Sequence, residues 1–422
     1  MKPKKPLELD GRTGEGGGQL VRISCALAAV TSQPIRITHV RGNREGPRGG
    51  GLKAQHVTSL AWLAAATSAT VTGLAVGSHT LEFRPALPPT ALKERRISIE
   101  AESAAASTLL ILQAILPYLL FAAGPEGDGD GDGDNKAIEL EIRGGTNVAF
   151  SLSWEYLDQV LLPTLAARFG VRVERKLLGR GWSVGPSKKG AVWFRIHPLR
   201  AGEKLRLARS DWDAPRTDED FALERIDASI LAPAGMHGAL QQELAKDLDV
   251  LFPDVDVRFV VTEDSGHDAR VYILLVAHSK TGLRWGRDWL YDRNRKKKTP
   301  EMVSREMSRK VGKELYEEVS LRGVVDEYLQ DQLVVFQALA EGRTSFARPT
   351  APIDEDIGGL ESAVDQLDIQ GQRRMRKDKT HEPFGEGSTH TTTARWVAAE
   401  LLPQATWFNK GSICEGAGVA LR

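Results

Sequence analysis

The sequence predicts an α+β fold in which β-α-β-α-β-β repeats form a large domain and a smaller α+β domain is inserted. Three observations predict it. Apolar residues alternate with a period of two in short segments and recur at helical spacing in longer ones. The order of these segments recurs at a spacing of about 90 residues, which indicates an internal repeat. Over residues 196–320 the strand and helix patterns differ from those of the repeats.

The first repeat begins with the strand LELDG. It continues with a helix over about residues 20–31, the strand PIRITHV, a helix over about residues 52–67, and the strands ATVTGL and HTLEFRP. Runs rich in Val, Ile and Thr favour strands, whereas apolar residues three and four apart favour helices.

The second repeat has the same order of elements. Its segments are RISIE, STLLILQAILPYLLF, AIELEIRGG, WEYLDQVLLPTLAARFG, VRVERKLL and AVWFRI. Helical patterns over residues 301–321, 326–340 and 391–402 are candidates for a third, disrupted copy.

These patterns predict the domain boundaries. Residues 1–195 form the first part of the large repeat domain, residues 196–320 the inserted small domain, and residues 321–422 the final part of the large domain. The insert contains DASILAPAG, HGALQQELAKDL, VDVRFVVTE and ARVYILLVAH. Within the last part, residues 343–387 are rich in Pro, Asp and Arg with little periodicity, and we expect a flexible insertion there.

A run of alternating Asp and Gly occupies residues 127–135. Asp128, Asp130, Asp132, Gly133 and Glu139 have the spacing of a calcium loop. A helix should follow such a loop, but IELEIRGG has the alternation of a strand. We therefore expect a low-complexity hairpin tip, with calcium binding as the alternative.

Composition excludes several classes of protein. The 422 residues carry 56 basic and 56 acidic side chains, so any polyanion site must be a local patch. Cys25 and Cys414 cannot build a zinc site alone, and a reducing compartment is expected. The N-terminus lacks the apolar run of a secretory signal. The longest apolar run, residues 108–123, contains Gln113 and Pro117 and predicts a buried core helix rather than a membrane span, so no membrane partner is expected.

Two glycine-rich loops precede helices in the first repeat. The first, DGRTGEGGGQLVR, has Glu15 among its glycines, and a carboxylate beside phosphates can hold a divalent metal. The second, HVRGNREGPRGGGLKAQH, is rich in arginines whose forked donors match phosphate oxygens. No GxxxxGK[ST] occurs, so a P-loop is excluded. The alternatives are a tight turn with a solvated Glu and a solvated charged face.

Six segments in order make the sequence similar to one family. They are GEGGGQLVR, the Arg-rich loop ending in AQH, GSHTLEFRP, RGGTN, VVDEYLQDQLVVFQALAEG and STHTTTARWVAAEL. Together they resemble the RNA 3′-terminal phosphate cyclases. The resemblance implies a large domain of three β-α-β-α-β-β repeats and an α+β domain inserted before the helices of the last repeat. It covers both ends of the chain well and the insert weakly.

The resemblance also implies a reaction. It is the ATP-dependent conversion of an RNA 3′-terminal phosphate to a 2′,3′-cyclic phosphate through an adenylylated histidine and an RNA-adenylate intermediate. His390 occupies the position of the histidine. A neutral imidazole is a good nucleophile near pH 7. The 2′-OH that closes the ring explains why RNA with a 3′-phosphate end is the expected partner.

The same resemblance implies roles for other residues. Asp331 is expected to orient the histidine or lie near the phosphates, and Glu15 to be an active-site carboxylate that binds Mg or Mn. The expected nucleotide contacts are Gln113, Tyr328, Gln332, Gln19 and Arg22. Arg41, Arg44 and Gln55 are expected to line the path of the triphosphate or the RNA end.

The sequence departs from the family pattern in three places. AFSLSWEY follows RGGTN where the family has a proline-containing segment of the adenine pocket. WSVGPSKKG replaces a glycine-rich turn, and a long insertion ending in HEPFGEGST precedes His390. These departures keep an alternative open, namely a non-catalytic cyclase-like RNA-binding factor of ribosome assembly.

A nuclear location is expected, with the cytoplasm as the alternative. The basic stretches RNRKKK (293–298) and RRMRK (373–377) match import signals, although such matches also arise by chance. The DEYLQDQ form of the fifth segment also favours a nuclear location.

Overall fold

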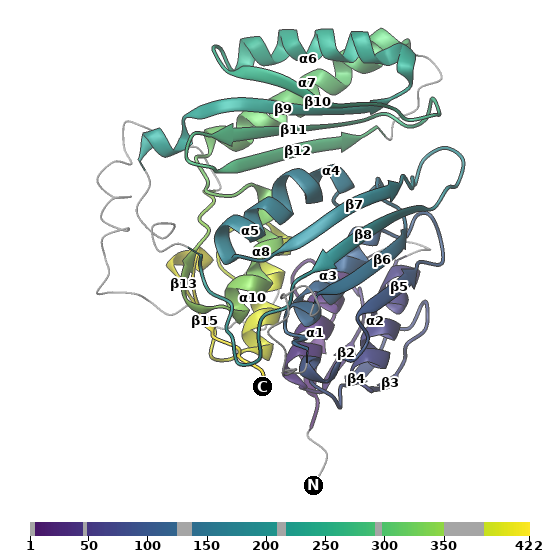
Figure 1. Ribbon diagram of the computed structural model, residues 1–422, viewed down its shortest axis with the longest axis vertical. Helices are drawn as coiled ribbons and strands as arrows, with labels where there is room; N and C mark the ends of the chain where they lie inside the picture. Colours follow the sequence, from purple (N-terminus) through teal and green to yellow (C-terminus); the bar gives the residue numbers. More distant parts are fainter. Residues whose placement is uncertain (1–4, 45–48, 125–136, 209–216, 292–297, 350–383) are drawn as a thin grey trace, which may run out of the picture.

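The structure is a computed structural model that describes residues 5–44, 49–124, 137–208, 217–291, 298–349 and 384–422. Its strands form three four-stranded sheets and one three-stranded sheet within these ranges. One of the four-stranded sheets, with helices α6 and α7 on its outer side, lies at one end of the molecule, and both termini lie toward the other end (Figure 1).

The first two repeats have the same topology. The first contains β1 (Leu7–Asp10), α1 (Gly18–Thr31), β2 (Ile35–Thr38), α2 (Ala54–Ala66), β3 (Thr70–Thr72) and β4 (Leu81–Arg84). Its sheet has the order β1-β2-β4-β3, with β1 and β2 parallel and the other pairs antiparallel. The predicted order of elements in this repeat is confirmed.

The second repeat contains β5 (Arg96–Glu100), α3 (Thr108–Leu120), β6 (Ile138–Gly144), a helix in three parts, β7 (Val173–Gly179) and β8 (Gly190–Ile196). The sheet order β5-β6-β8-β7 repeats that of the first sheet. Glu139 lies in β6, so the segment after the Asp/Gly run is a strand, as expected. The other four residues of the calcium-loop pattern lie outside the described residues.

The three-part helix consists of α4 (Trp154–Tyr156), the π-helical segment η3 (Leu157–Leu161) and α5 (Leu162–Phe169). Pro163 has no N–H and cannot donate to the carbonyl of Gln159 four residues earlier. Arg284 from the insert donates to that carbonyl instead, at 3.1 Å. The carbonyl that Pro163 leaves without a helical partner thus provides a contact between the second repeat and the insert.

The third repeat is incomplete. It contains α8 (Glu327–Leu339), β13 (Glu341–Ser345), α10 (Thr389–Leu401), β14 (Thr406–Phe408) and β15 (Ile413–Ala417), in a sheet of order β13-β15-β14. In the described part of the chain, the counterpart of the first strand is reduced to one parallel bridge between Arg206 and Glu341. Residues 343–345, at the start of the expected insertion over 343–387, pair with β15, and residues 350–383 of that segment lie outside the described residues.

The insert consists of β9 (Leu223–Ala232), α6 (His237–Leu251), β10 (Asp256–Asp264), β11 (Tyr272–Ser279), β12 (Arg284–Leu290) and α7 (Pro300–Ser320). Strand β11 is buried along its whole length because both faces of the sheet are covered. Ile273 and Leu275 pack with α6 and α7, whereas Leu274 and Val276 join the core of the large domain.

One candidate for the third repeat belongs elsewhere. Val303, Met307, Val311 and Leu315 of α7 pack into the core under the insert sheet, so the helical pattern over residues 301–321 is part of the insert. The physical reason is the spacing of this apolar stripe, which matches the sheet face of the insert. The domain boundaries at residues 195 and 320 stay predictions.

The centre of the large domain is helical. Helix α1 packs against α3 and α10, and α10 packs against α8, within one continuous apolar core. The N-terminal turns of α1, α8 and α10 carry the polar residues described below. No helix in the described ranges is long and apolar enough to cross a membrane.

Phe150 has an unfavourable backbone for its residue type. Its φ is 69°, in the left-handed region, and its side chain is 101% exposed. We expect Phe150→Asn to raise the free energy of unfolding by about 1 kcal/mol, because asparagine tolerates this region and no packing is lost. Urea unfolding measures the change. Val76→Asn is the control, since Val76 is 58% exposed without a positive φ. Equal effects of the two substitutions would contradict the assignment of strain.

Candidate active site

The first glycine-rich loop folds against the start of α10. The backbone N–H of Glu15 donates to Thr393 Oγ1 at 2.8 Å. Gly14 has φ 64°, and a Cβ there would lie 2.2 Å from Thr393 Oγ1. A Cβ on Gly18 would lie 2.5 Å from His56 Nε2. The glycines therefore allow the loop to approach two side chains from other elements.

His390 is the second residue of α10, which begins two residues before the helical pattern predicted over residues 391–402. Ser388 caps the helix and accepts from the N–H of Thr391 at 3.2 Å. The imidazole remains accessible to solvent, and its Nδ1 lies 2.9 Å from Gln19 Oε1. Gln19, the second residue of α1, in turn donates through Nε2 to Asp331 Oδ2 at 2.7 Å. The buried side-chain amide of Gln19 thus links the N-terminal turns of α1 and α10 to α8.

A second arm reaches Asp331 from the opposite side. Arg22 Nε donates to Gln113 Oε1 at 2.6 Å, and Gln113 Nε2 donates to Gln332 Oε1 at 2.9 Å. Gln332 Nε2 then donates to Asp331 Oδ1 at 3.0 Å. We call the two arms together the amide chain: His390, Gln19, Asp331, Gln332, Gln113 and Arg22.

The ends of the amide chain fix the direction of every hydrogen bond in it. Arginine can only donate and an ionised carboxylate can only accept. Gln19 must therefore turn its N–H groups toward Asp331 and its oxygen toward His390. That oxygen needs a donor, so His390 carries its proton on Nδ1 and leaves a lone pair on Nε2. The arrangement prepares Nε2 as a nucleophile.

Two pKa shifts accompany this arrangement. Burial raises the pKa of Asp331 from 3.8 to about 7, although Gln332, Arg22 and Gln19 favour its ionised form. Desolvation, together with the charges of Arg22 and Arg44, lowers the pKa of His390 below 6.5. His390 is thus neutral at neutral pH, and Asp331 is the group that titrates there.

Arg22 and His56 present two donors to the same space. His56 Nδ1 accepts from the backbone N–H of Lys53 at 3.0 Å, so a neutral ring carries its proton on Nε2. That Nε2 lies 3.4 Å from Arg22 Nη1. Burial lowers the pKa of His56 well below 6.5, and Arg22 and Arg41 add to the effect. Two adjacent donors fit an anion between them.

The remaining predicted residues of the second loop and α2 lie around this point. Arg41 donates to the carbonyls of Gly49 and Gly51, at 2.8 and 3.3 Å. Arg44 pairs with Glu15. Gln55 accepts from the backbone N–H of Ser107 at 3.4 Å, a long contact that links α2 to the start of α3.

Glu15 is the predicted metal ligand. Its carboxylate is buried and forms an ion pair with Arg44, and apart from this pair neither oxygen accepts a hydrogen bond from the residues that the structure describes. No group of three or more His, Cys, Asp or Glu side chains that could hold a metal occurs in the described ranges. A cation at Glu15 would need most of its ligands from phosphate oxygens and water.

Tyr328 lies apart from the amide chain. It is the second residue of α8, with its ring against Tyr156 and Arg287 of neighbouring elements. An apolar cavity opens beside the Gln113–Gln332 pair, between α3, η3, α5 and α8, and its walls include Leu109.

Sequence reasoning missed several residues of the site. His56, Asn43 and Thr393 were not singled out, although each lies in a quoted segment. Asn43 Nδ2 donates to the carbonyls of Arg12 and Gly14, at 2.6 and 3.2 Å, and thereby holds the first loop. Only the close approach of the two loops could have revealed this role.

Comparison with known proteins shows the family of the chain. The family described as "RNA 3'-terminal phosphate cyclase" matches residues 13–405. The chain belongs to this family. Its cyclase relatives are enzymes, and the α+β fold class and the resemblance predicted from the sequence are confirmed.

Three relatives have the same printed name, "RNA 3'-terminal phosphate cyclase". The Pyrococcus furiosus protein is 30% identical over 84% of this chain and 92% of its own length. The Thermococcus sibiricus protein is 31% identical over 79% and 86%, and the Ignicoccus hospitalis protein is 32% identical over 80% and 86%. These cyclases are archaeal and lend no support to a nuclear location. Both basic stretches lie outside the described residues except for Lys298.

Proposed function

We propose that this chain converts an RNA 3′-terminal phosphate to a 2′,3′-cyclic phosphate at the expense of ATP, through adenylylated His390. The observation that carries the proposal is the amide chain, which leaves a lone pair on His390 Nε2. The nucleophile lies in the first turn of α10, where the helix dipole favours an anionic substrate. The names of the cyclase relatives support the same substrate.

The proposed reaction has three steps. His390 Nε2 attacks the α-phosphorus of ATP, a P–N bond forms, and the P–O bond to pyrophosphate breaks. An oxygen of the RNA 3′-phosphate then attacks the same phosphorus, and the P–N electron pair returns to Nε2. Finally the 2′-OH attacks the 3′-phosphorus, loses its proton, and expels AMP.

The surrounding residues have distinct tasks in this scheme. Gln19 holds the Nδ1 proton, so the imidazole stays oriented while the charge on the ring changes. Arg22 and Arg44, whose charges already lower the pKa of His390, would stabilise the charge on the leaving pyrophosphate. Arg41 and Gln55 would line the path of the triphosphate or RNA end.

The nucleotide would occupy the region between α3 and α8. The apolar cavity beside Gln113 and Gln332 suits a flat base with amide groups at its edge. Tyr328 would contribute its exposed ring surface. A divalent metal held by Glu15 would supply charge neutralisation for the phosphates, and Glu15 would have to release Arg44 to bind it.

Covalent labelling tests the proposal. The protein is incubated with α-³²P-labelled ATP and Mg²⁺ or Mn²⁺ and run on a denaturing gel. We expect an acid-labile labelled band that RNA ending in a 3′-phosphate discharges, whereas the same RNA ending in a 3′-hydroxyl does not. Absence of the band in a folded protein that binds RNA tightly would refute the proposal and favour a non-catalytic RNA-binding factor.

A further inference from the structure

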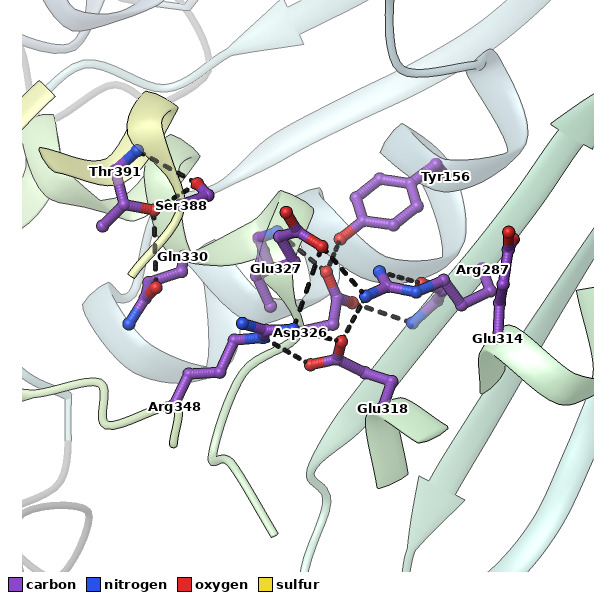
Figure 2. A network of polar contacts seen from close by, with 12 residues as sticks. Tyr156, Arg287, Glu314, Glu318, Asp326, Glu327, Gln330, Arg348, Ser388 and Thr391 are labelled. Carbon is purple, nitrogen blue, oxygen red and sulfur yellow. Dashed lines mark hydrogen bonds and ion pairs between the residues drawn. The ribbon is translucent and has the colours of Figure 1, made fainter. Parts of the chain in front are cut away.

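A cluster of mostly buried charged side chains joins the insert to the start of α8. Figure 2 shows Arg287, Glu318, Glu327 and Arg348 around Asp326, the residue that caps α8. Arg287 comes from β12, and Glu318 from the last turn of α7, so both belong to the insert. The cluster therefore fixes the insert against the helix that carries Tyr328 and Asp331.

Hydrogen bonds on Asp326 hold the helix start in place. Its Oδ1 accepts from the N–H of Leu329 at 2.9 Å and from Tyr156 Oη at 2.6 Å. Its Oδ2 accepts from the N–H of Gly286, the neighbour of Arg287, at 2.8 Å. The backbone of β12 and the start of α8 thus share one fully buried carboxylate.

Both guanidinium groups of the cluster already have carboxylate partners without the aromatic ring. Glu318 contacts Arg287 and receives two hydrogen bonds from Arg348, at 2.7 and 2.8 Å. Glu327 lies 3.5 Å from Arg287 and 3.8 Å from Arg348. Two arginines thus face two glutamates, so ion pairing alone does not require either guanidinium to stack on Tyr328.

Arg287 nevertheless lies over Tyr328. Its Cζ is 4.6 Å from the centre of the ring, and the ring of Tyr156 meets Tyr328 at 6.1 Å with an interplanar angle of 74°. Because Asp331 and Gln332 follow three and four residues later, they lie on the same face of α8 as Tyr328. Tyr328 remains 37% exposed, and its ring therefore keeps exposed surface.

We propose that Arg287 is a positioning residue, which holds the Tyr328 ring in the orientation that binds the nucleotide. This inference rests on the proposed function. It assigns the insert a direct influence on the site, because β12 supplies the guanidinium that limits the rotation of Tyr328. A planar guanidinium can pair with Glu318 and lie flat on the ring at the same time, whereas a compact, strongly hydrated ammonium has no plane with which to stack.

The test is a pair of matched substitutions. Arg287→Lys keeps a charge for Glu318 but removes the stack, and Arg348→Lys changes the other partner of Glu318, which does not touch Tyr328. Calorimetry measures AMP binding to the intact protein, and labelling with ATP gives KM and the maximal rate. We expect Arg287→Lys to weaken AMP binding and raise the KM for ATP about three- to tenfold, with a maximal rate within about twofold. Arg348→Lys should change both constants less than about twofold, even where melting temperatures fall equally.

A double-mutant cycle separates positioning from stability. In a Tyr328→Ala background, Arg287→Lys should have no further effect on AMP affinity. Equal weakening by Arg287→Lys and Arg348→Lys would overturn the inference, and so would an effect that persists without Tyr328. Unchanged AMP affinity in Tyr328→Ala alone would overturn both the inference and the Tyr328 contact. The covalent labelling of the unaltered protein decides the proposed function independently of all three outcomes.

Discussion

His390→Ala is expected to abolish covalent labelling by α-³²P-labelled ATP, with at least a roughly thousandfold loss of the labelled band. The reason is that the amide chain leaves a free lone pair on His390 Nε2, and alanine has no atom that could form the P–N bond. Folding should survive, because the imidazole is accessible and its hydrogen bond in the described structure is the one to Gln19. Circular dichroism and the melting temperature check this.

The control for this prediction is another histidine. His197 lies 3.2 Å from Glu174 and does not contact the amide chain, so His197→Ala should label like the unaltered protein. Label retained by His390→Ala would place the nucleophile elsewhere. Loss of the band in both variants would point to a general loss of folding instead.

The repeats could be predicted because their signal is local. In the first two repeats, strand alternation and helical spacing recur in the same order, and β1 to β8 follow that order. In the third repeat the helices α8 and α10 were predicted but the strands were not, and strand β13 reads EGRTS, a segment without apolar alternation. Its burial depends on pairing with β15, about 70 residues later in the chain, as in the pair Thr344 and Cys414.

The candidate site could be predicted only as a set of residues. The glycine-rich loops and the segment around His390 are recognisable one by one, but Gln19 and His390 are 371 positions apart. That Gln19 stands between His390 and Asp331 depends on how α1, α8 and α10 pack. Tyr328 shows another limit. The resemblance implied it as a nucleotide contact, but its partner Arg287 comes from the insert, which the family resemblance covered only weakly.

Asp331→Asn is expected to slow labelling by about two to four orders of magnitude, even though the substitution keeps size and shape. Both arms of the amide chain end on acceptor oxygens of Asp331, and asparagine offers only one. If Gln332 turns to suit the new amide, Gln113 must turn as well and presents its N–H groups to Arg22, which cannot accept. If Gln19 turns instead, its N–H groups face His390, and the imidazole moves its proton to Nε2. The nucleophile is then lost without any change at His390 itself.

The pH dependence provides the sharper measurement. Protonation of Asp331 disturbs the amide chain as asparagine does. The labelling rate of the unaltered protein should therefore rise about tenfold per pH unit below about 7 and level off above it, and Asp331→Asn should lack this pH-dependent rise.

The free energy of unfolding should depend on pH in the opposite direction. Because the pKa of Asp331 is raised by folding from 3.8 to about 7, its contribution is most favourable below pH 4 and is lost as the pH rises through 7. Relative to the unaltered protein, Asp331→Asn should therefore gain up to about 4 kcal/mol between pH 4 and pH 8 in urea unfolding. A single labelling limb below pH 6.5, shared by both proteins, would assign the titration to His390 and contradict the role of Asp331.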